Sequence, residues 1–142
     1  MNVFSTEGSK KDDLWLVDGS PNFAIFPGGI IESIASDAPI FLKVGNQAFG
    51  ETHIRTKHAQ WLAKHQRTVA EMVHFKLGQP GQIYCTEDGS KFKINLGIAP
   101  SALLVLNFLS HEQIGPHFSV TTLYYHQQRL DGMPLGRYPG RR

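Results

Sequence analysis

The chain has 142 residues, enough for one domain with a buried core that needs no disulfide or metal support. Its 41% hydrophobic and 18% charged residues are ordinary for a soluble globular protein, and a net charge of +2 alone indicates no particular partner. The single cysteine, Cys85, excludes an internal disulfide. No apolar run is long enough to cross a bilayer and no signal segment precedes the core, so we expect no membrane anchoring in this chain.

The N-terminal third has the weakest structural signals. Residues 1–13 are polar and lack apolar periodicity, which predicts a flexible lead. Short apolar runs follow at 14–17 and 23–26, and each ends in Gly and Pro residues that favour turns. Residues 40–44 have the composition of a strand. We therefore expect an irregular segment over residues 1–45.

Two helices are predicted after this segment. Thr52 is a plausible N-cap for a helix that runs to about Lys64, with an apolar side formed by Ile54, Trp61 and Leu62. Residues 68–71 read Thr-Val-Ala-Glu, the pattern of a capping box in which each end residue satisfies an unpaired amide of the other.

The helix that follows the capping box has apolar residues at helical spacing. They are Val69, Met72, Val73 and Leu77, and Gly78 with Pro80 should end the helix.

Four strands are predicted next. Residues 82–86 and 91–96 flank Glu-Asp-Gly-Ser at 87–90, which favours a hairpin. Residues 103–109 are almost wholly apolar and should form a central strand, and residues 118–125 alternate and are rich in aromatics. The order predicts an α+β fold with two helices packed on a four- to five-stranded antiparallel sheet. The core would span residues 46–130, and residues 131–142 would form a flexible basic tail.

The first predicted helix carries a cluster of proton-transfer and cationic side chains. His53 and Lys57 are four residues apart and therefore lie on one face, while Arg55 and His58 point elsewhere on the same helix. Cleavage of a phosphodiester needs a base, an acid and cations for the developing charge, and imidazole with Lys or Arg provides them. The alternative is a helix end with an exposed His and ordinary solvated cations.

The last predicted strand carries hydroxyl groups on both faces. Ser119, Thr121, Thr122, Tyr124 and Tyr125 can donate hydrogen bonds to phosphate oxygens, and a tyrosine ring can stack on an unpaired base. The alternative is structural, because Thr and Tyr suit the half-buried surface of any strand.

The remaining candidates are weaker. No His pair has zinc-ligand spacing and only one cysteine is present, so we expect no metal and no other cofactor. His117 and His126 flank the last strand, and either could be a second catalytic imidazole or a surface residue. Cys85 could act as a nucleophile with His53, although a small buried side chain is the simpler interpretation.

The order of these motifs resembles the barnase–EndoU–colicin–RelE-like (BECR) nuclease superfamily, in the form found in polymorphic bacterial toxins. The similar features are Gly-x-x-His-Ile-x-x-Lys-His at 50–58, a second short helix, Gly-x-Ile-Tyr at 81–84, an apolar central strand and Val-Thr-Thr-x-Tyr-Tyr at 120–125. The resemblance covers residues 50–125. Each motif is short, and their order and spacing carry the similarity.

The resemblance implies a metal-independent ribonuclease toxin directed at RNA, with tRNA the expected target. Cleavage would proceed by attack of the ribose 2′-hydroxyl and leave a 2′,3′-cyclic phosphate. His53 would transfer protons, Lys57 would bind the phosphate and His58 would assist, while Thr121, Thr122 and Tyr124 would hold the phosphate or base. Arg55, Ser119 and Tyr125 would contact the substrate.

The resemblance also implies a biological setting. The toxin would be delivered as part of a larger secreted or cell-surface protein of a contact-dependent growth inhibition system, would act in the cytoplasm of the target cell, and would be held inactive by a cognate immunity protein.

Two other interpretations stay open on the sequence. The chain could be a non-catalytic interaction module, such as an immunity or adaptor protein, although its 14 basic and 12 acidic residues do not give the acidic face expected of a nuclease inhibitor. It could also be a cysteine-dependent hydrolase built on Cys85 and His53.

Overall fold

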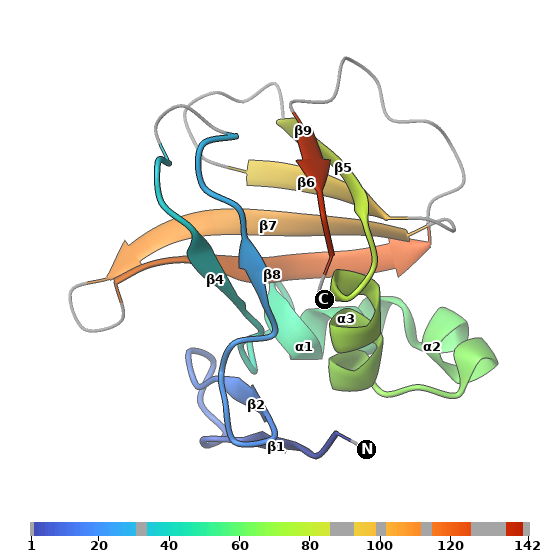
Figure 1. Ribbon diagram of the computed structural model, residues 1–142. Coiled ribbons are helices and arrows are strands. Elements are labelled where there is room, and N and C mark those ends of the chain that lie inside the picture. Colours follow the sequence, from blue (N-terminus) through green and yellow to red (C-terminus); the bar gives the residue numbers. More distant parts are fainter. Residues whose placement is uncertain are drawn as a thin grey trace.

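A computed structural model describes residues 2–30, 34–85, 93–98, 102–111, 115–125 and 136–140. These residues form three helices, a large curved sheet and a separate two-stranded sheet (Figure 1). The predicted α+β class is confirmed. Within the described ranges, no helix has the length and apolar character needed to cross a membrane.

The large sheet has seven strands rather than the predicted four or five. Their order across the sheet is β3 (Ala24–Phe26), β4 (Ala38–Phe41), β8 (Gly115–Tyr125), β7 (Ala102–His111), β6 (Lys93–Ile98), β5 (Gly81–Cys85) and β9 (Gly136–Tyr138). The antiparallel series β5-β6-β7-β8 confirms the predicted meander, with apolar β7 between β6 and β8. The predicted hairpin turn at 87–90 lies outside the described residues.

The sheet is not wholly antiparallel, because β4 pairs with β8 in parallel. In addition, β3 pairs with β4 at one edge and β9 pairs with β5 at the other. These additions come from the ends of the chain, where the strand segments are too short for their periodicity to predict them.

The N-terminal segment is not irregular, so that expectation is wrong. β1 (Phe4–Thr6) pairs with β2 (Trp15–Val17), and the Leu14 carbonyl accepts a hydrogen bond from the Glu7 amide. The predicted flexible lead is thus a hairpin, and β3 and β4 lie in the same third of the chain.

The described part of the predicted loose tail is ordered against the sheet. Tyr138 of β9 is fully buried, and its hydroxyl donates a hydrogen bond to the Leu77 carbonyl. Burying an aromatic ring and satisfying its hydroxyl fixes a strand of only three residues, which composition could not reveal.

The first predicted helix is two helices, α1 (Gly50–Lys57) and α2 (Ala59–His65), which are separated at His58. No Gly or Pro marks this break in the sequence. Thr52 is not the N-cap, because Phe49 takes that position and the Thr52 hydroxyl instead donates to the Val44 carbonyl at 2.9 Å.

The second predicted helix is confirmed as α3 (Val69–Leu77). The Thr68–Glu71 capping box forms in both directions, and Gly78 is the C-cap. The predicted apolar stripe is buried, with Val69, Met72, Val73 and Leu77 each at most 3% exposed.

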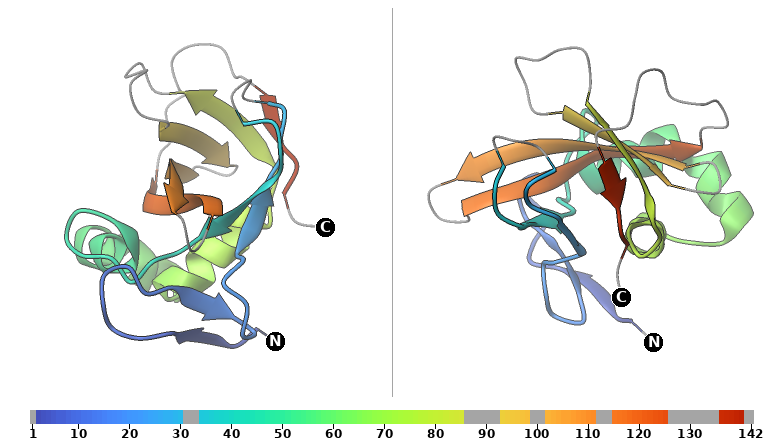
Figure 2. Two further views of the ribbon diagram at one scale, coloured as in Figure 1. Left: turned by 90° about the vertical axis from the view of Figure 1, so that its left-hand side faces the viewer. Right: turned by 45° about the horizontal axis from the view of Figure 1, so that its top comes forward.

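The sheet curls around the core, so that its two edges approach each other (Figure 2). Ile30, which follows β3, contacts the backbone of β9 so closely that a Cβ added at Gly136 would lie 2.9 Å from its side chain. The core joins the sheet to the helices through Phe26, Phe118 and Leu104 on one side and Ile54, Met72 and Leu77 on the other. This shared core fixes the helices relative to β8.

Candidate functional site

A backbone connection to the end of β4 places α1 in the fold. The Lys43 carbonyl accepts a hydrogen bond from the Glu51 amide at 3.0 Å, and the Val44 carbonyl accepts one from the Thr52 amide at 2.9 Å. Because the strand that ends at Phe41 pairs with β8, the first turn of α1 is carried to the flank of β8, and the two elements pack together. The two elements that carry the predicted site residues are therefore neighbours.

The loop before α1 requires glycine at two positions. Gly45 and Gly50 have φ values of +72° and +79°, in the left-handed region that side chains disfavour. A Cβ at Gly45 would also collide with the Phe49 carbonyl oxygen, and one at Gly50 would lie 2.7 Å from the Lys43 carbonyl oxygen. The two glycines therefore allow a tight turn, which places residues 46–49 next to the start of α1.

This loop orients the His53 ring. His53 Nδ1 lies 2.7 Å from the Gln47 carbonyl oxygen. A carbonyl can only accept, so Nδ1 must carry the hydrogen, and in the neutral ring Nε2 is then the basic nitrogen. His53 is partly exposed. The geometry provides an imidazole with a fixed tautomer and one nitrogen ready to take a proton.

A second imidazole lies against the first. The rings of His53 and His58 meet edge to face with centroids 6.2 Å apart. Burial lowers the pKa of His58, and the nearby His53 and Lys57 lower it further. His58 is therefore neutral over a wider pH range than an ordinary histidine, which suits a base rather than an acid.

The two cations of α1 differ in availability. Arg55 donates to Glu51 across one helical turn at 2.9 Å, and this ion pair already satisfies part of its guanidinium. Lys57 is exposed, and no ion pair involves it among the residues that the structure describes. Of the two cations, Lys57 is thus the more available to bind an anion.

The threonines of β8 lie at an irregularity in the strand. Val105 pairs with Thr122 and Leu106 with Val120, so Thr121 is the extra residue of a β-bulge. The bulge shifts the alternation, so that Phe118, Val120 and Leu123 all reach the core. The Oγ1 atoms of Thr121 and Thr122 are shielded from solvent and have no hydrogen-bond partner among the described residues. In this conformation, the two hydroxyls are not accessible to a ligand at the surface.

The other predicted strand residues contribute less. Ser119 is only 4% exposed, which leaves it little access to a substrate. His117 is 1% exposed and its ring stacks on Phe41 with centroids 5.1 Å apart, so it is neither a surface residue nor an accessible catalytic group. Tyr124 and Tyr125 belong to β8, but the described part of the structure does not extend to their side chains or to that of Cys85. His126 lies outside the described residues.

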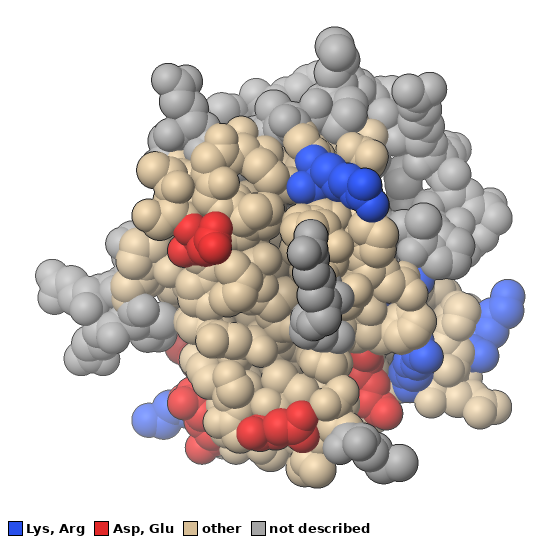
Figure 3. Space-filling model, in the orientation of Figure 1, with Lys and Arg blue, Asp and Glu red and all other residues tan. Residues whose placement is uncertain are grey.

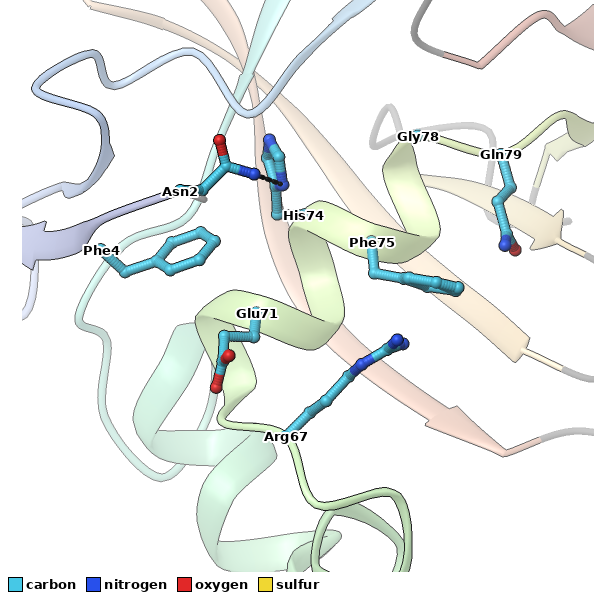
Figure 4. A pocket seen from close by; sticks show the side chains of 8 residues that line it. All are labelled: Asn2, Phe4, Arg67, Glu71, His74, Phe75, Gly78 and Gln79. Atoms are coloured by element: carbon cyan, nitrogen blue, oxygen red, sulfur yellow. Dashed lines mark hydrogen bonds between the residues drawn. The ribbon is translucent and has the colours of Figure 1, made fainter.

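Sequence reasoning missed a pair of pockets on α3. The larger, of about 430 Å³, is open and lies between α3 and β1 (Figure 4). The smaller, of about 250 Å³, lies between α2 and α3. Both are lined by Arg67, Phe75 and Gln79. The available signal was Phe75, an aromatic residue on α3 outside the predicted apolar stripe.

Neither of these pockets includes residues of α1, although α1 carries the reactive groups. Among the described residues, no group of three or more His, Cys, Asp and Glu side chains is arranged to hold a metal ion. Comparisons of the chain with family models, with curated proteins and with solved structures found no match.

Proposed function

We propose that this protein is a metal-independent endoribonuclease, with tRNA as its expected substrate and α1 as its catalytic element. The observation that carries the proposal is the His53 ring, which the Gln47 carbonyl holds in one tautomer on a helix packed against β8. The neighbouring His58 and the exposed Lys57 supply a second neutral imidazole and a free cation.

The proposed reaction uses groups of α1 alone. His53 Nε2 takes the proton from a ribose 2′-hydroxyl, and the oxygen attacks the adjacent phosphorus. The Lys57 ammonium stabilises the negative charge that develops on the phosphate oxygens. The bond from phosphorus to the 5′-oxygen breaks, this oxygen takes a proton from solvent, and His53 returns its own proton to solvent. The products are a 2′,3′-cyclic phosphate and a 5′-hydroxyl.

The β8 threonines have an indirect role in this proposal. Their buried hydroxyls lie in the strand against which α1 packs, so we assign them to the support of α1 rather than to phosphate binding. Arg55 shapes the site through its ion pair with Glu51, which engages Nε and leaves the two terminal nitrogens of an exposed side chain to contact a phosphate.

The biological setting rests on the resemblance of residues 50–125 to BECR toxins. On that basis we propose that the domain acts as a toxin in the cytoplasm of a target cell after delivery by a larger protein. A cognate immunity protein would then cover the surface around α1.

The direct test is incubation of the purified protein with total cellular RNA in the presence of a chelator, followed by mapping of new ends. We expect new 3′ ends with cyclic phosphate, 5′-hydroxyl partners and enrichment of tRNA fragments. Activity that disappears with chelator and returns with a divalent metal would overturn the metal-free mechanism. A failure to cleave any RNA would instead favour an interaction module.

Two lysines make a matched pair for the cation. Lys57 of α1 and Lys64 of α2 are both exposed and near helix ends. Lys57→Gln should lower the cleavage rate about 10- to 100-fold, because a charge contact in the transition state is lost, whereas Lys64→Gln should cleave at the normal rate. Equal rates for the two variants would remove Lys57 from the mechanism.

A further inference from the structure

The smaller pocket, between α2 and α3, has the features of a ligand site rather than a packing defect. Trp61 and His65 of α2 face Met72, Phe75 and Lys76 of α3 across it, and Gln79 lies beyond the end of α3. With a volume of about 250 Å³, it holds one planar ring system and not a folded element. We refer to it as the α2–α3 pocket.

Two polar atoms at this pocket lack partners. Trp61 Nε1 and Gln79 Oε1 are both shielded from solvent, and neither has a hydrogen-bond partner among the described residues. Leaving buried donors and acceptors unpaired is costly, and native proteins rarely do so without a reason. One is a donor and the other an acceptor. Because both atoms are shielded as they stand, the two side chains must turn toward the pocket for a ligand with both functions to satisfy them together.

The pocket also concentrates positive charge. Arg67 places its guanidinium 3.7 Å from the centre of the Phe75 ring, and the Lys76 ammonium lies 5.6 Å from the same centre. No ion pair involves either cation within the described part of the chain. No acidic residue lines this pocket among the described residues, whereas Glu71 lines the larger pocket together with Arg67, whose charge helps to lower the Glu71 pKa (Figure 4).

The environment of Lys76 disfavours its positive charge. It is only 7% exposed, and burial lowers its pKa, with a further lowering from the Arg67 charge. A bound anion would offset both effects. Figure 3 shows basic side chains at the margin formed by α2, whereas acidic side chains prevail over the β1–β2 part of the same face. An anionic strand would therefore be attracted to the side of the molecule that carries α2.

We propose that the α2–α3 pocket binds one unpaired nucleobase of an RNA strand, with the adjacent phosphate held by Arg67 and Lys76. The aromatic walls favour a flat ring, the Trp61 N–H and the Gln79 carbonyl pair with the base edge, and the cations favour the backbone. The inference rests on the proposed ribonuclease function and adds a substrate-binding site to it. The pocket lies on α2, which follows α1 directly at His58.

Binding can be measured apart from cleavage. The probe is a fluorescent single-stranded d(A)₄, which lacks the 2′-hydroxyl and so cannot be cut by the proposed reaction, with affinity read by anisotropy. Trp61→Phe keeps the ring and removes only the N–H, and it should weaken binding about three- to tenfold. Trp15→Phe is the matched control, because Trp15 Nε1 is also buried and unpaired but Trp15 lies in β2, outside the pocket.

Two further measurements separate the contribution of the base to binding from that of the phosphate. An abasic strand with the same backbone should bind about tenfold more weakly than d(A)₄. Lys76→Gln should weaken binding and reduce its salt dependence more than Lys64→Gln, because Lys64 lies on α2 but does not line the pocket. Thermal unfolding of each variant shows that the fold is retained.

The outcomes distinguish this site from the proposed activity. Weaker binding by Trp61→Phe in a protein that cuts no RNA would support the site and reject the ribonuclease. Cleavage of RNA with equal binding by Trp61→Phe, Trp15→Phe and wild type would reject the site and keep the ribonuclease. If 5′-AMP binds as tightly as d(A)₄, the pocket is a mononucleotide site and the strand assignment is overturned.

Discussion

His53 depends on a loop whose conformation only glycine can adopt. Gly45→Ala should lower the free energy of unfolding by about 1 kcal/mol for the positive φ and by more for the collision with the Phe49 carbonyl. Because the loop also carries Gln47, RNA cleavage should fall together with stability. Urea unfolding and cleavage rates measure both effects.

The control for this substitution is Gly19→Ala. Gly19 has a φ of +83° but no atoms within 4 Å of an added Cβ. It should therefore show the conformational cost alone and cleave RNA normally. Equal losses in the two variants would mean that the 45–50 loop has no special role.

His58 makes stability depend on pH. Its pKa is lowered in the folded state from an ordinary value of 6.5, mainly by burial, so the unfolded chain binds more protons. The free energy of unfolding should therefore decrease as the pH falls below about 6.5 and stay unaffected by this group above it. In His58→Gln, the decrease between pH 6.5 and 5 should be smaller, as urea titrations at a series of pH values will show. An unchanged slope would contradict the buried, neutral His58.

The sequence identified which residue types form this site, but not their hydrogen-bond partners or their burial. Spacing alone placed His53 above Lys57 on one helix face. The Nδ1 contact with Gln47, the edge contact with His58 and the engagement of Arg55 by Glu51 depend on tertiary structure. Spacing also could not show that the Thr121 and Thr122 hydroxyls are buried, because a β-bulge in β8 shifts the strand.

At the scale of elements, α3 is fixed by its cap. Thr68→Ala removes the side-chain acceptor for the Glu71 amide and should lower the free energy of unfolding by about 1 kcal/mol, whereas Thr68→Ser should retain most of the stability. The Thr68 amide and hydroxyl lower the pKa of Glu71, so its contribution is present above pH 4.5 and is lost as the pH falls through the lowered value. Equal stability of the Ala and Ser variants would argue against the cap.

Strand β9 depends on one residue. Tyr138→Phe keeps the buried ring and removes the hydrogen bond to the Leu77 carbonyl, so it should cost about 1 kcal/mol. Tyr138→Ala should cost about 3–5 kcal/mol, because it also leaves a cavity. Chemical denaturation measures both values. A negligible effect of Tyr138→Ala would mean that β9 does not stabilise the fold.

Helices and strands with strong local signals were predicted correctly. Those that form only by pairing or packing with a distant segment were not. The capping box, the apolar stripe of α3 and the apolar run of β7 are local, and the structure confirms them. β1, β2 and β9 are three residues each and exist only through pairing or burial. The break at His58 has no local marker at all.

On the scale of the whole molecule, long-range pairing determines the shape. The parallel contact of β4 with β8 joins the N-terminal third to the last long strand and carries α1 to its place. The α+β class followed from the order of elements, but the seven-stranded curved sheet did not, since no sequence pattern specifies which strand lies beside another.

In the proposed cleavage of RNA, the His53 imidazole transfers the proton. The most direct measurement maps the 3′ ends of tRNA after incubation with wild type and with His53→Gln, with chelator present in both reactions. We expect 2′,3′-cyclic ends from wild type and a rate about 100- to 10,000-fold lower from the folded variant. Cleavage by His53→Gln at the wild-type rate would contradict this role of His53.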